Sequence, residues 1–163
     1  MKLSDFLVRD AIIIDLASTT RDGAIREIVQ GFLGAGQLVG QSPDDLTAVL
    51  LEREKLGSTG IGRGVAVPHA KLPFLRRVIG SIALAPHGVE FHTIDGKPVD
   101  VFFSLFNPSA DLRTSLLACE AAARRLSDEG FLARLRQCRT REEVFDLVVE
   151  TDEEAAGAAE PSK

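Results

Sequence analysis

The sequence has no tyrosine, no tryptophan and a single methionine among its 163 residues, and it has no excess of positive charge. Proteins that bind single-stranded nucleic acids stack the bases on aromatic side chains, and in this chain only phenylalanine could serve. Proteins that bind the phosphate backbone normally carry a basic surface, whereas the formal net charge here is −5. We therefore expect no nucleic-acid partner.

Long hydrophobic runs are also missing. No apolar stretch approaches the roughly 20 residues that cross a bilayer. The first ten residues, MKLSDFLVRD, lack the continuous apolar core of a signal peptide. These absences predict a protein without membrane insertion, either cytoplasmic or cut from a larger chain. The length fits a single domain, and the 45% hydrophobic residues are ordinary for a globular fold.

The two cysteines, Cys119 and Cys138, have no CxxC spacing and lie on hydrophobic stripes of predicted helices. We interpret them as small buried residues rather than as a disulfide or a metal site. Of the three histidines, His87 and His92 lie in a turn-rich segment and are interpreted as surface residues. Neither has the short spacing to His69 that a zinc site requires, so we expect no metal.

Hydrophobic periodicity predicts strands and helices that are interspersed along the chain. Apolar and β-branched runs predict strands at residues 11–16, 65–67, 78–84 and 99–106. Helical stripes follow capping residues at positions 18–20, 42, 109–111, 128 and 140. The nearly continuous apolar run at 99–106 indicates a central strand covered on both faces. The expected fold is an α/β or α+β domain over residues 1–150, with a flexible tail at 151–163.

Residues 53–71, REKLGSTGIGRGVAVPHAK, contain the most unusual stretch of the chain. Its four glycines, at positions 57, 60, 62 and 64, allow positive φ angles and can expose successive backbone N–H groups to an anion. Ser58 and Thr59 add hydroxyl donors. The stretch is not a Walker A loop, because no Gly-Lys-Ser/Thr follows, and it is not GxGxxG, because Val65 occupies the third glycine position. Taken alone, such a loop is more often a simple turn.

His69 directly follows Pro68 at the end of this loop and changes that interpretation. Imidazole titrates near neutrality, so its neutral form is a nucleophile at physiological pH. A phosphoryl group on His69 would need donors for its oxygens and a nearby cation, because phosphoryl transfer relies on positioning and electrostatic stabilisation. The loop residues supply such donors, and Arg53 supplies a cation. Arg53 lies on the inward stripe of its helix, where its stem could equally cover apolar surface.

Residues 53–69 resemble the phosphorylation-site signature of phosphotransferase-system enzyme IIA proteins of the mannitol, fructose and nitrogen-regulatory type. Residues 91–100, FHTIDGKPVD, resemble a second family segment, F-D-x-x-D-G-x-P-V-D, with His92 in place of the usual acid. The similarity extends over residues 3–150. The resemblance implies a single α/β domain with a five-stranded mixed sheet flanked by helices, and it implies no metal or organic cofactor.

The resemblance also implies a phosphocarrier that receives its phosphoryl group from phospho-HPr or the nitrogen-branch paralogue of HPr. His69 would accept the group through Nε2, and Arg53 would stabilise it. The predicted phosphoryl-binding loop residues are Ser58, Thr59, Gly60 and Gly62. The group would pass to a cysteine of a IIB domain, or the phosphorylation state would regulate a kinase or transporter. Because no IIB, IIC or HPr-like segment is present, the regulatory nitrogen branch is favoured over a sugar transporter.

Ser115 departs from the family pattern, because the corresponding helix typically carries a second histidine at this position. A serine can donate a hydrogen bond, but it is shorter and carries no positive charge. We therefore hypothesise that the phosphohistidine is less stabilised or forms more slowly. Ser115 also supports an alternative: an interaction module of the same fold that regulates partners by contact, with phosphotransfer weakened or absent. It shares its predicted inward helix face with Leu112, Leu116 and Cys119.

Overall fold

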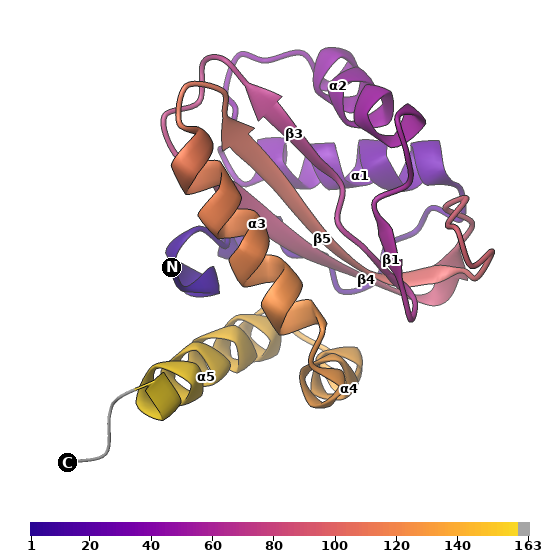
Figure 1. Cartoon of the computed structure of the whole chain (residues 1–163). Helices are drawn as coiled ribbons and strands as arrows, with labels where there is room; N and C mark the ends of the chain where they lie inside the picture. The colour runs from indigo at the N-terminus through magenta and orange to yellow at the C-terminus, as the bar shows by residue number, and fades with distance from the viewer. Residues whose placement is uncertain (160–163) are drawn as a thin grey trace.

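A five-stranded mixed sheet with helices on both faces forms the architecture, as the sequence predicts (Figure 1). The computed structural model of the protein describes residues 1–159. The strands are β1 (Gly60–Gly62), β2 (Val65–Ala66), β3 (His69–Leu72), β4 (Ile79–Val89) and β5 (Val99–Pro108). The helices are α1 (Arg21–Gly34), α2 (Pro43–Lys55), α3 (Leu112–Leu126), α4 (Glu129–Gln137) and α5 (Arg141–Ala159). Two short 3-10 helices, η1 (Leu3–Asp5) and η2 (Arg9–Ala11), precede them.

β5 is the central strand of the sheet. It pairs in parallel with β2 and β3 along one edge and antiparallel with β4 along the other, while β1 pairs antiparallel with β2. Its side chains alternate between two hydrophobic cores, with Phe103 and Leu105 on one face and Phe102 and Phe106 on the other. The predicted central strand with both faces covered is therefore confirmed.

The two cores separate the helices into two layers. α1 and α2 cover one face of the sheet, where Phe32 of α1 packs edge-to-face on Phe106, with ring centroids 5.3 Å apart. α3 lies across the opposite face, with α4 and α5 beyond it (Figure 1). On that face Phe6, from the loop after η1, packs on Phe103 with centroids 6.2 Å apart. No helix within residues 1–159 combines the length and the hydrophobicity that crossing a membrane requires.

The predicted helix starts are confirmed by their caps. Thr20, Ser42 and Asp111 precede α1, α2 and α3, and each side chain accepts a hydrogen bond from a backbone N–H in the first turn. Pro43 occupies the first turn of α2, where its missing N–H is not needed. β4 continues to Val89, so the turn-rich segment begins later than the sequence predicted.

The predicted strand at residues 11–16 is wrong. Ala11 ends η2, and Ile13 forms only an isolated bridge to Ala83 of β4. The segment follows the outer edge of β4 without becoming part of the sheet. Ile12 is fully buried, so packing against the core rather than strand pairing explains the β-branched run.

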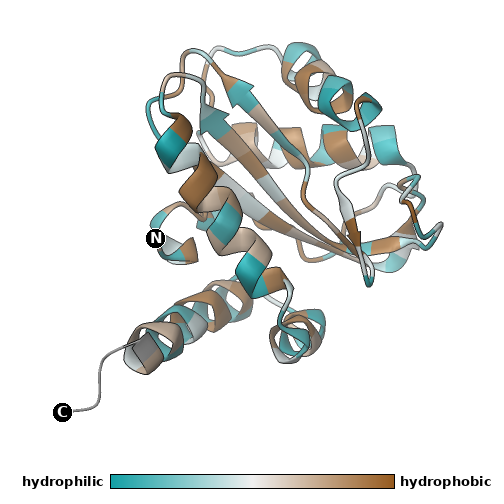
Figure 2. Ribbon diagram, viewed as in Figure 1, coloured by the Kyte–Doolittle hydropathy of each residue, from teal (hydrophilic) through white to brown (hydrophobic). Residues whose placement is uncertain are grey.

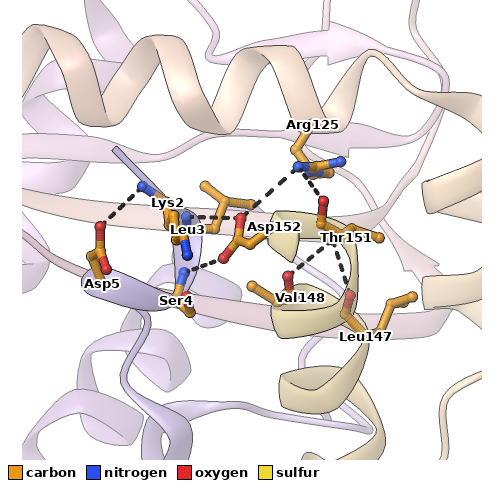
Figure 3. Close-up of polar contacts among 9 residues, drawn as sticks. All are labelled: Lys2, Leu3, Ser4, Asp5, Arg125, Leu147, Val148, Thr151 and Asp152. Carbon is orange, nitrogen blue, oxygen red and sulfur yellow. Dashed lines mark hydrogen bonds and ion pairs between the residues drawn. The ribbon is translucent and has the colours of Figure 1, made fainter. Parts of the chain in front are cut away.

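α5 continues to Ala159, so residues 151–159 are helical where the sequence predicted a flexible tail. Asp152 is 5% exposed and ties this helix to the start of the chain (Figure 3). Its carboxylate accepts hydrogen bonds from the N–H groups of Leu3, at 3.2 Å, and Ser4, at 2.9 Å. Hydrophobic periodicity misses this turn because the buried residues are polar. The last four residues of the predicted tail lie outside the described residues.

Replacing Asp152 with alanine would leave two backbone N–H groups of η1 without their acceptor. We expect the free energy of unfolding to fall by about 2–3 kcal/mol, the range for hydrogen bonds to a charged group. Urea denaturation measures this change. The control is Glu153→Ala at the exposed neighbouring position, which should change the value by less than about 0.5 kcal/mol. Equal stability of the two variants would contradict the role assigned to Asp152.

Candidate functional site

His69 lies where the strand alongside β5 is interrupted. β2 and β3 pair with β5 in one continuous register, since Ala66 is opposite Phe102 and His69 is opposite Leu105. The two residues between them, Val67 and Pro68, leave the ladder because proline has no N–H to donate. Leu105 N still donates to Pro68 O at 2.9 Å. The interruption therefore lies directly before His69, which is itself held in register opposite Leu105.

The orientation of the His69 ring is fixed by the backbone of the same interruption. Its Nδ1 lies 2.8 Å from Val67 O. A carbonyl oxygen can only accept, so this hydrogen bond places the ring proton on Nδ1. The lone pair of the neutral ring is then on Nε2. This is the nitrogen through which the resemblance implies phosphoryl transfer.

A buried carboxylate supports this arrangement from α2. Glu54, 5% exposed, accepts hydrogen bonds from both the amide and the hydroxyl of Thr59, with an N–O distance of 3.1 Å for the amide. Thr59 O in turn accepts from Val67 N at 3.0 Å. Glu54, Thr59, Val67 and His69 are thus joined by consecutive hydrogen bonds. Sequence reasoning missed Glu54, although it lies within the glycine-loop motif.

The glycines of the loop serve mainly to turn the chain. Gly62, Arg63 and Gly64 all have positive φ angles, of 87°, 57° and 78°, and join β1 to β2. A Cβ on Gly64 would lie 2.6 Å from the carboxylate of Asp100, so a larger residue does not fit there. Arg63 donates to Leu126 O at 3.3 Å, which ties the turn to the end of α3. The predicted repeated use of positive φ is confirmed at these positions.

Three donors of the predicted phosphoryl-binding loop are already engaged in hydrogen bonds within this structure. The Thr59 amide and hydroxyl donate to Glu54, and Gly60 N donates to the Ser58 hydroxyl at 3.1 Å. These donors would reach a phosphoryl group only if their present bonds broke. Binding by Ser58, Thr59, Gly60 and Gly62 therefore stays a prediction.

Arg53 forms a hydrogen bond with the backbone at the start of the glycine-rich loop. It is half-buried near the end of α2, and its Nη1 donates to Gly57 O at 2.9 Å. It is not among the residues of the described chain that line the pocket at His69. Its contact with a phosphoryl group likewise stays a prediction.

His69 lines a pocket of about 340 Å³ that lies between β3, β5 and α3. The lining residues are His69, Lys71, Asn107, Leu112, Ser115, Leu116 and Cys119. The structure thus brings together His69 and Ser115, two of the residues predicted from the sequence. Sequence reasoning missed Lys71 and Asn107. Strand alternation could have found both, because each lies two positions beyond His69 or its partner Leu105 on the same face of the sheet.

Ser115 contributes little donor capacity to this pocket. It is 4% exposed, and its hydroxyl lies 2.8 Å from Asp111 O and 3.2 Å from Pro108 O. A hydroxyl has one proton, and here that proton is held by these backbone carbonyls. Such bonding to the preceding turn is usual for serine in helices. Ser115 therefore does not replace the donor that a second histidine would supply.

The predicted inward face of α3 is wrong for two of its leucines. Leu112 and Leu116 are 62% and 61% exposed, whereas the buried residues of α3 are Ser115, Ala118, Ala122 and Leu126. Figure 2 shows hydrophobic segments in the first half of α3. The leucines therefore form an apolar rim beside His69 instead of part of the core.

The two cysteines are free thiols in the described chain, and Cys138 is buried as predicted. Cys119 is only half-buried and lines the His69 pocket. Burial raises the pKa of the Cys119 thiol, and a hydrogen bond from Asn107 and the charge of Lys71 offset part of this increase. The thiol therefore stays protonated near neutral pH. Residues 1–159 contain no group of three histidine, cysteine or acidic side chains arranged to hold a metal ion.

The fold and the pocket together define a class of protein: an α/β domain that presents Nε2 of a histidine at a strand interruption, beside a helix with an apolar rim. Comparison with known families narrows this class. The sequence profile of the family described as phosphoenolpyruvate-dependent sugar phosphotransferase system, EIIA 2, matches residues 5–151. The chain belongs to this EIIA 2 family.

Individual relatives agree with this assignment. A nitrogen regulatory protein of Bradyrhizobium diazoefficiens is 34% identical over 148 residues, which cover 91% of this chain and 95% of that protein. The crystal structure of nitrogen regulatory protein IIA-Ntr from Neisseria meningitidis superimposes with a TM-score of 0.80 at 26% identity, covering 90% of this chain and 98% of the other. The fold is also that of Escherichia coli IIA mannitol in its complex with phosphorylated IIB mannitol, with a TM-score of 0.69 at 19% identity and coverage of 86% and 95%.

The hydrogen bonds of Glu54 can be tested by removing its charge. In Glu54→Gln the side chain can no longer accept from both donors of Thr59 with full strength, so we expect the loop to open more often. Hydrogen exchange at the Thr59 amide should become at least about tenfold faster, the equivalent of about 1.4 kcal/mol.

The exposed neighbour Glu52 provides the control for this measurement. Glu52→Gln should leave the exchange rate of the Thr59 amide unchanged, because the one ion pair of Glu52 within residues 1–159 is with Lys55, at 3.5 Å. An unchanged rate in Glu54→Gln would show that Glu54 does not hold the loop.

Proposed function

We propose that the protein is a phosphocarrier in which Nε2 of His69 accepts a phosphoryl group from phospho-HPr or its nitrogen-branch paralogue. The observation on which the proposal rests is the bond from Nδ1 of His69 to Val67 O, which leaves Nε2 as the nucleophilic nitrogen. Membership of the EIIA 2 family supports a role in the phosphotransferase system.

The transfer is an exchange between two nitrogens. The Nε2 lone pair forms a bond to phosphorus, and the N–P bond of the donor breaks and returns its electron pair to the donor imidazole. Positive charge then develops on the His69 ring, and the Val67 carbonyl stabilises it through the retained Nδ1 proton. In the onward step the acceptor, a cysteine thiolate of a IIB domain, attacks phosphorus, and Nε2 regains its lone pair. Lys71, exposed at the mouth of the pocket, supplies positive charge for the phosphoryl oxygens.

The surface around the pocket suits transient partners. Leu112 and Leu116 form an apolar rim at the entrance, and exposed apolar residues clustered around a reactive group indicate a protein-binding surface. Similarity to nitrogen regulatory proteins favours the regulatory branch, in which the phosphorylation state controls a kinase or transporter. The complex of Escherichia coli IIA mannitol with phosphorylated IIB supports a IIB domain as the other acceptor.

The alternative function is an interaction module of the same fold with weakened or absent phosphotransfer. Ser115 favours it, because its hydroxyl is held by backbone carbonyls and it supplies no positive charge. The consecutive hydrogen bonds that join Glu54 to His69 through Thr59 and Val67 argue against it, because they orient a nucleophile that a pure interaction module would not need. Phosphotransfer is therefore the leading proposal.

Phosphorylation can be detected directly by mass. After incubation with phosphoenolpyruvate, enzyme I and HPr, we expect an acid-labile increase of about 80 Da, corresponding to one phosphoryl group. His69→Ala should abolish it, because the nucleophilic nitrogen is lost. His92→Ala, which removes an exposed histidine, should retain it. Wild-type protein that gains no mass would refute the carrier proposal, and a phosphorylated His69→Ala would place the acceptor elsewhere.

Ser115→His tests whether a cation is missing from the site. An added imidazolium near Nε2 should lengthen the lifetime of the phosphohistidine by about threefold to tenfold through a charge-assisted contact. Ser115→Ala should leave that lifetime unchanged, since the serine hydroxyl is already engaged by the backbone. Release of inorganic phosphate from the phosphorylated protein measures both. If Ser115→His has no effect, the weakened-site hypothesis fails.

A further inference from the structure

Asn107 is the one buried residue of the His69 pocket, within residues 1–159, whose hydrogen-bonding capacity is largely unused. It is 2% exposed, and its Oδ1 has no hydrogen-bond partner in this part of the chain. Its Nδ2 has a single weak contact, to Cys119 Sγ at 3.9 Å. A buried amide without partners costs folding free energy, so its presence calls for an explanation.

The position of Asn107 in β5 is a second observation that points to a role for the unused amide. Val101, Phe103 and Leu105 precede it on the same face of the strand, and all three are fully buried hydrophobic residues. A fourth apolar residue would complete this row without leaving a polar group unpaired. The row ends in an amide at the pocket, which indicates a role at the site rather than in the core.

Asn107 is also adjacent to the phosphoryl acceptor. In the parallel pairing of β3 with β5, His69 is opposite Leu105 and Lys71 is opposite Asn107. Strands in a sheet lie about 4.8 Å apart, and side chains two positions apart point to the same face. His69 and Asn107 are therefore diagonal neighbours on one face, and both line the pocket.

We propose that Asn107 binds the phosphoryl group on His69, with an N–H of its side-chain amide donating to a phosphoryl oxygen. The inference rests on the phosphocarrier function proposed above. Ser115 cannot fill this role because its proton is held by backbone carbonyls. Asn107 thus supplies, as a neutral donor, part of what the second histidine of the family pattern would supply.

The assignment does not depend on which way the amide is turned. As placed, Nδ2 has two N–H groups and only one weak contact, so one N–H is free for the phosphoryl group. If the amide is turned over, its oxygen accepts from the Cys119 thiol and both N–H groups become free. Either orientation provides a donor in the pocket that His69 also lines.

Two substitutions separate binding from packing. Asn107→Leu keeps a similar size and removes the donor, and Asn107→Asp keeps the shape and adds a charge that repels the phosphoryl group. We expect the phosphohistidine to hydrolyse about tenfold faster in Asn107→Leu, the loss of one hydrogen bond to a charged group, and faster still in Asn107→Asp. The thermal stability of unphosphorylated Asn107→Leu should equal or exceed that of the wild type, because the variant removes an unpaired buried amide.

Ser104→Ala is the matched control. Ser104 lies on the same strand, is 1% exposed and also has an unpartnered hydroxyl oxygen, but it alternates to the opposite face. Its replacement should leave the phosphohistidine lifetime unchanged. In wild-type protein, the side-chain amide signals of Asn107 in a proton–nitrogen NMR spectrum should shift on phosphorylation, and those signals should be absent in Asn107→Leu.

The possible outcomes distinguish the two proposals. Wild-type protein that accepts no phosphoryl group would overturn the phosphocarrier function and this inference together. A phosphorylated wild type whose lifetime is matched by Asn107→Leu would overturn the inference alone. If Asn107→Leu hydrolyses its phosphohistidine faster but also loses thermal stability, the inference is likewise overturned. That result would show that Asn107 has a structural role.

Discussion

The hydrogen bond from Nδ1 of His69 to Val67 O is the interaction on which the proposed site depends. It selects the tautomer, directs Nε2 outward and can stabilise charge on the ring during transfer. The bond exists because Val67 and Pro68 leave the ladder along β5, which turns the Val67 carbonyl toward the ring that follows it. A continuous strand would point this carbonyl sideways into the sheet. The interruption of the strand is therefore the structural basis of the proposed site.

The surrounding structure keeps that interruption from relaxing. On one side, β2 and β3 hold a common register with β5, so the backbone before and after the break is anchored. On the other side, Glu54 fixes Thr59, whose carbonyl accepts from the Val67 amide. A buried carboxylate is costly unless it is hydrogen-bonded, and Glu54 meets that condition only in the present loop conformation. The start of the glycine-rich loop is thus held by hydrogen bonds to an acid in α2.

Much of the fold could be predicted from the sequence, because its strongest signals are periodic. The apolar run of β5 and the capped stripes of α1 and α2 reflect burial, which decides both pattern and structure. Prediction failed where the hydrophobic pattern of the sequence does not match which residues are buried. Residues 11–16 are β-branched but run along an edge, and Asp152 is buried by hydrogen bonds that hydropathy cannot register. Leu112 and Leu116 fit the inward stripe in composition but are exposed at a site.

The sequence predicts the nucleophile of the proposed site more directly than its supporting residues. His69 is recognised from local sequence because its setting is contiguous, and Ser115 is found through the family resemblance, whereas Asn107 reaches the pocket from another strand. The hydrogen bonding of Ser115 and Asn107 also changes how the absence of a second histidine is interpreted. A serine with a free hydroxyl would be a weakened substitute, but the hydroxyl of Ser115 is occupied, and the spare donor belongs to Asn107. The pocket therefore combines a neutral amide with the peripheral charge of Lys71. In the proposed phosphocarrier such a site would position the phosphoryl oxygens by geometry more than by charge, which suits a group that must be passed on.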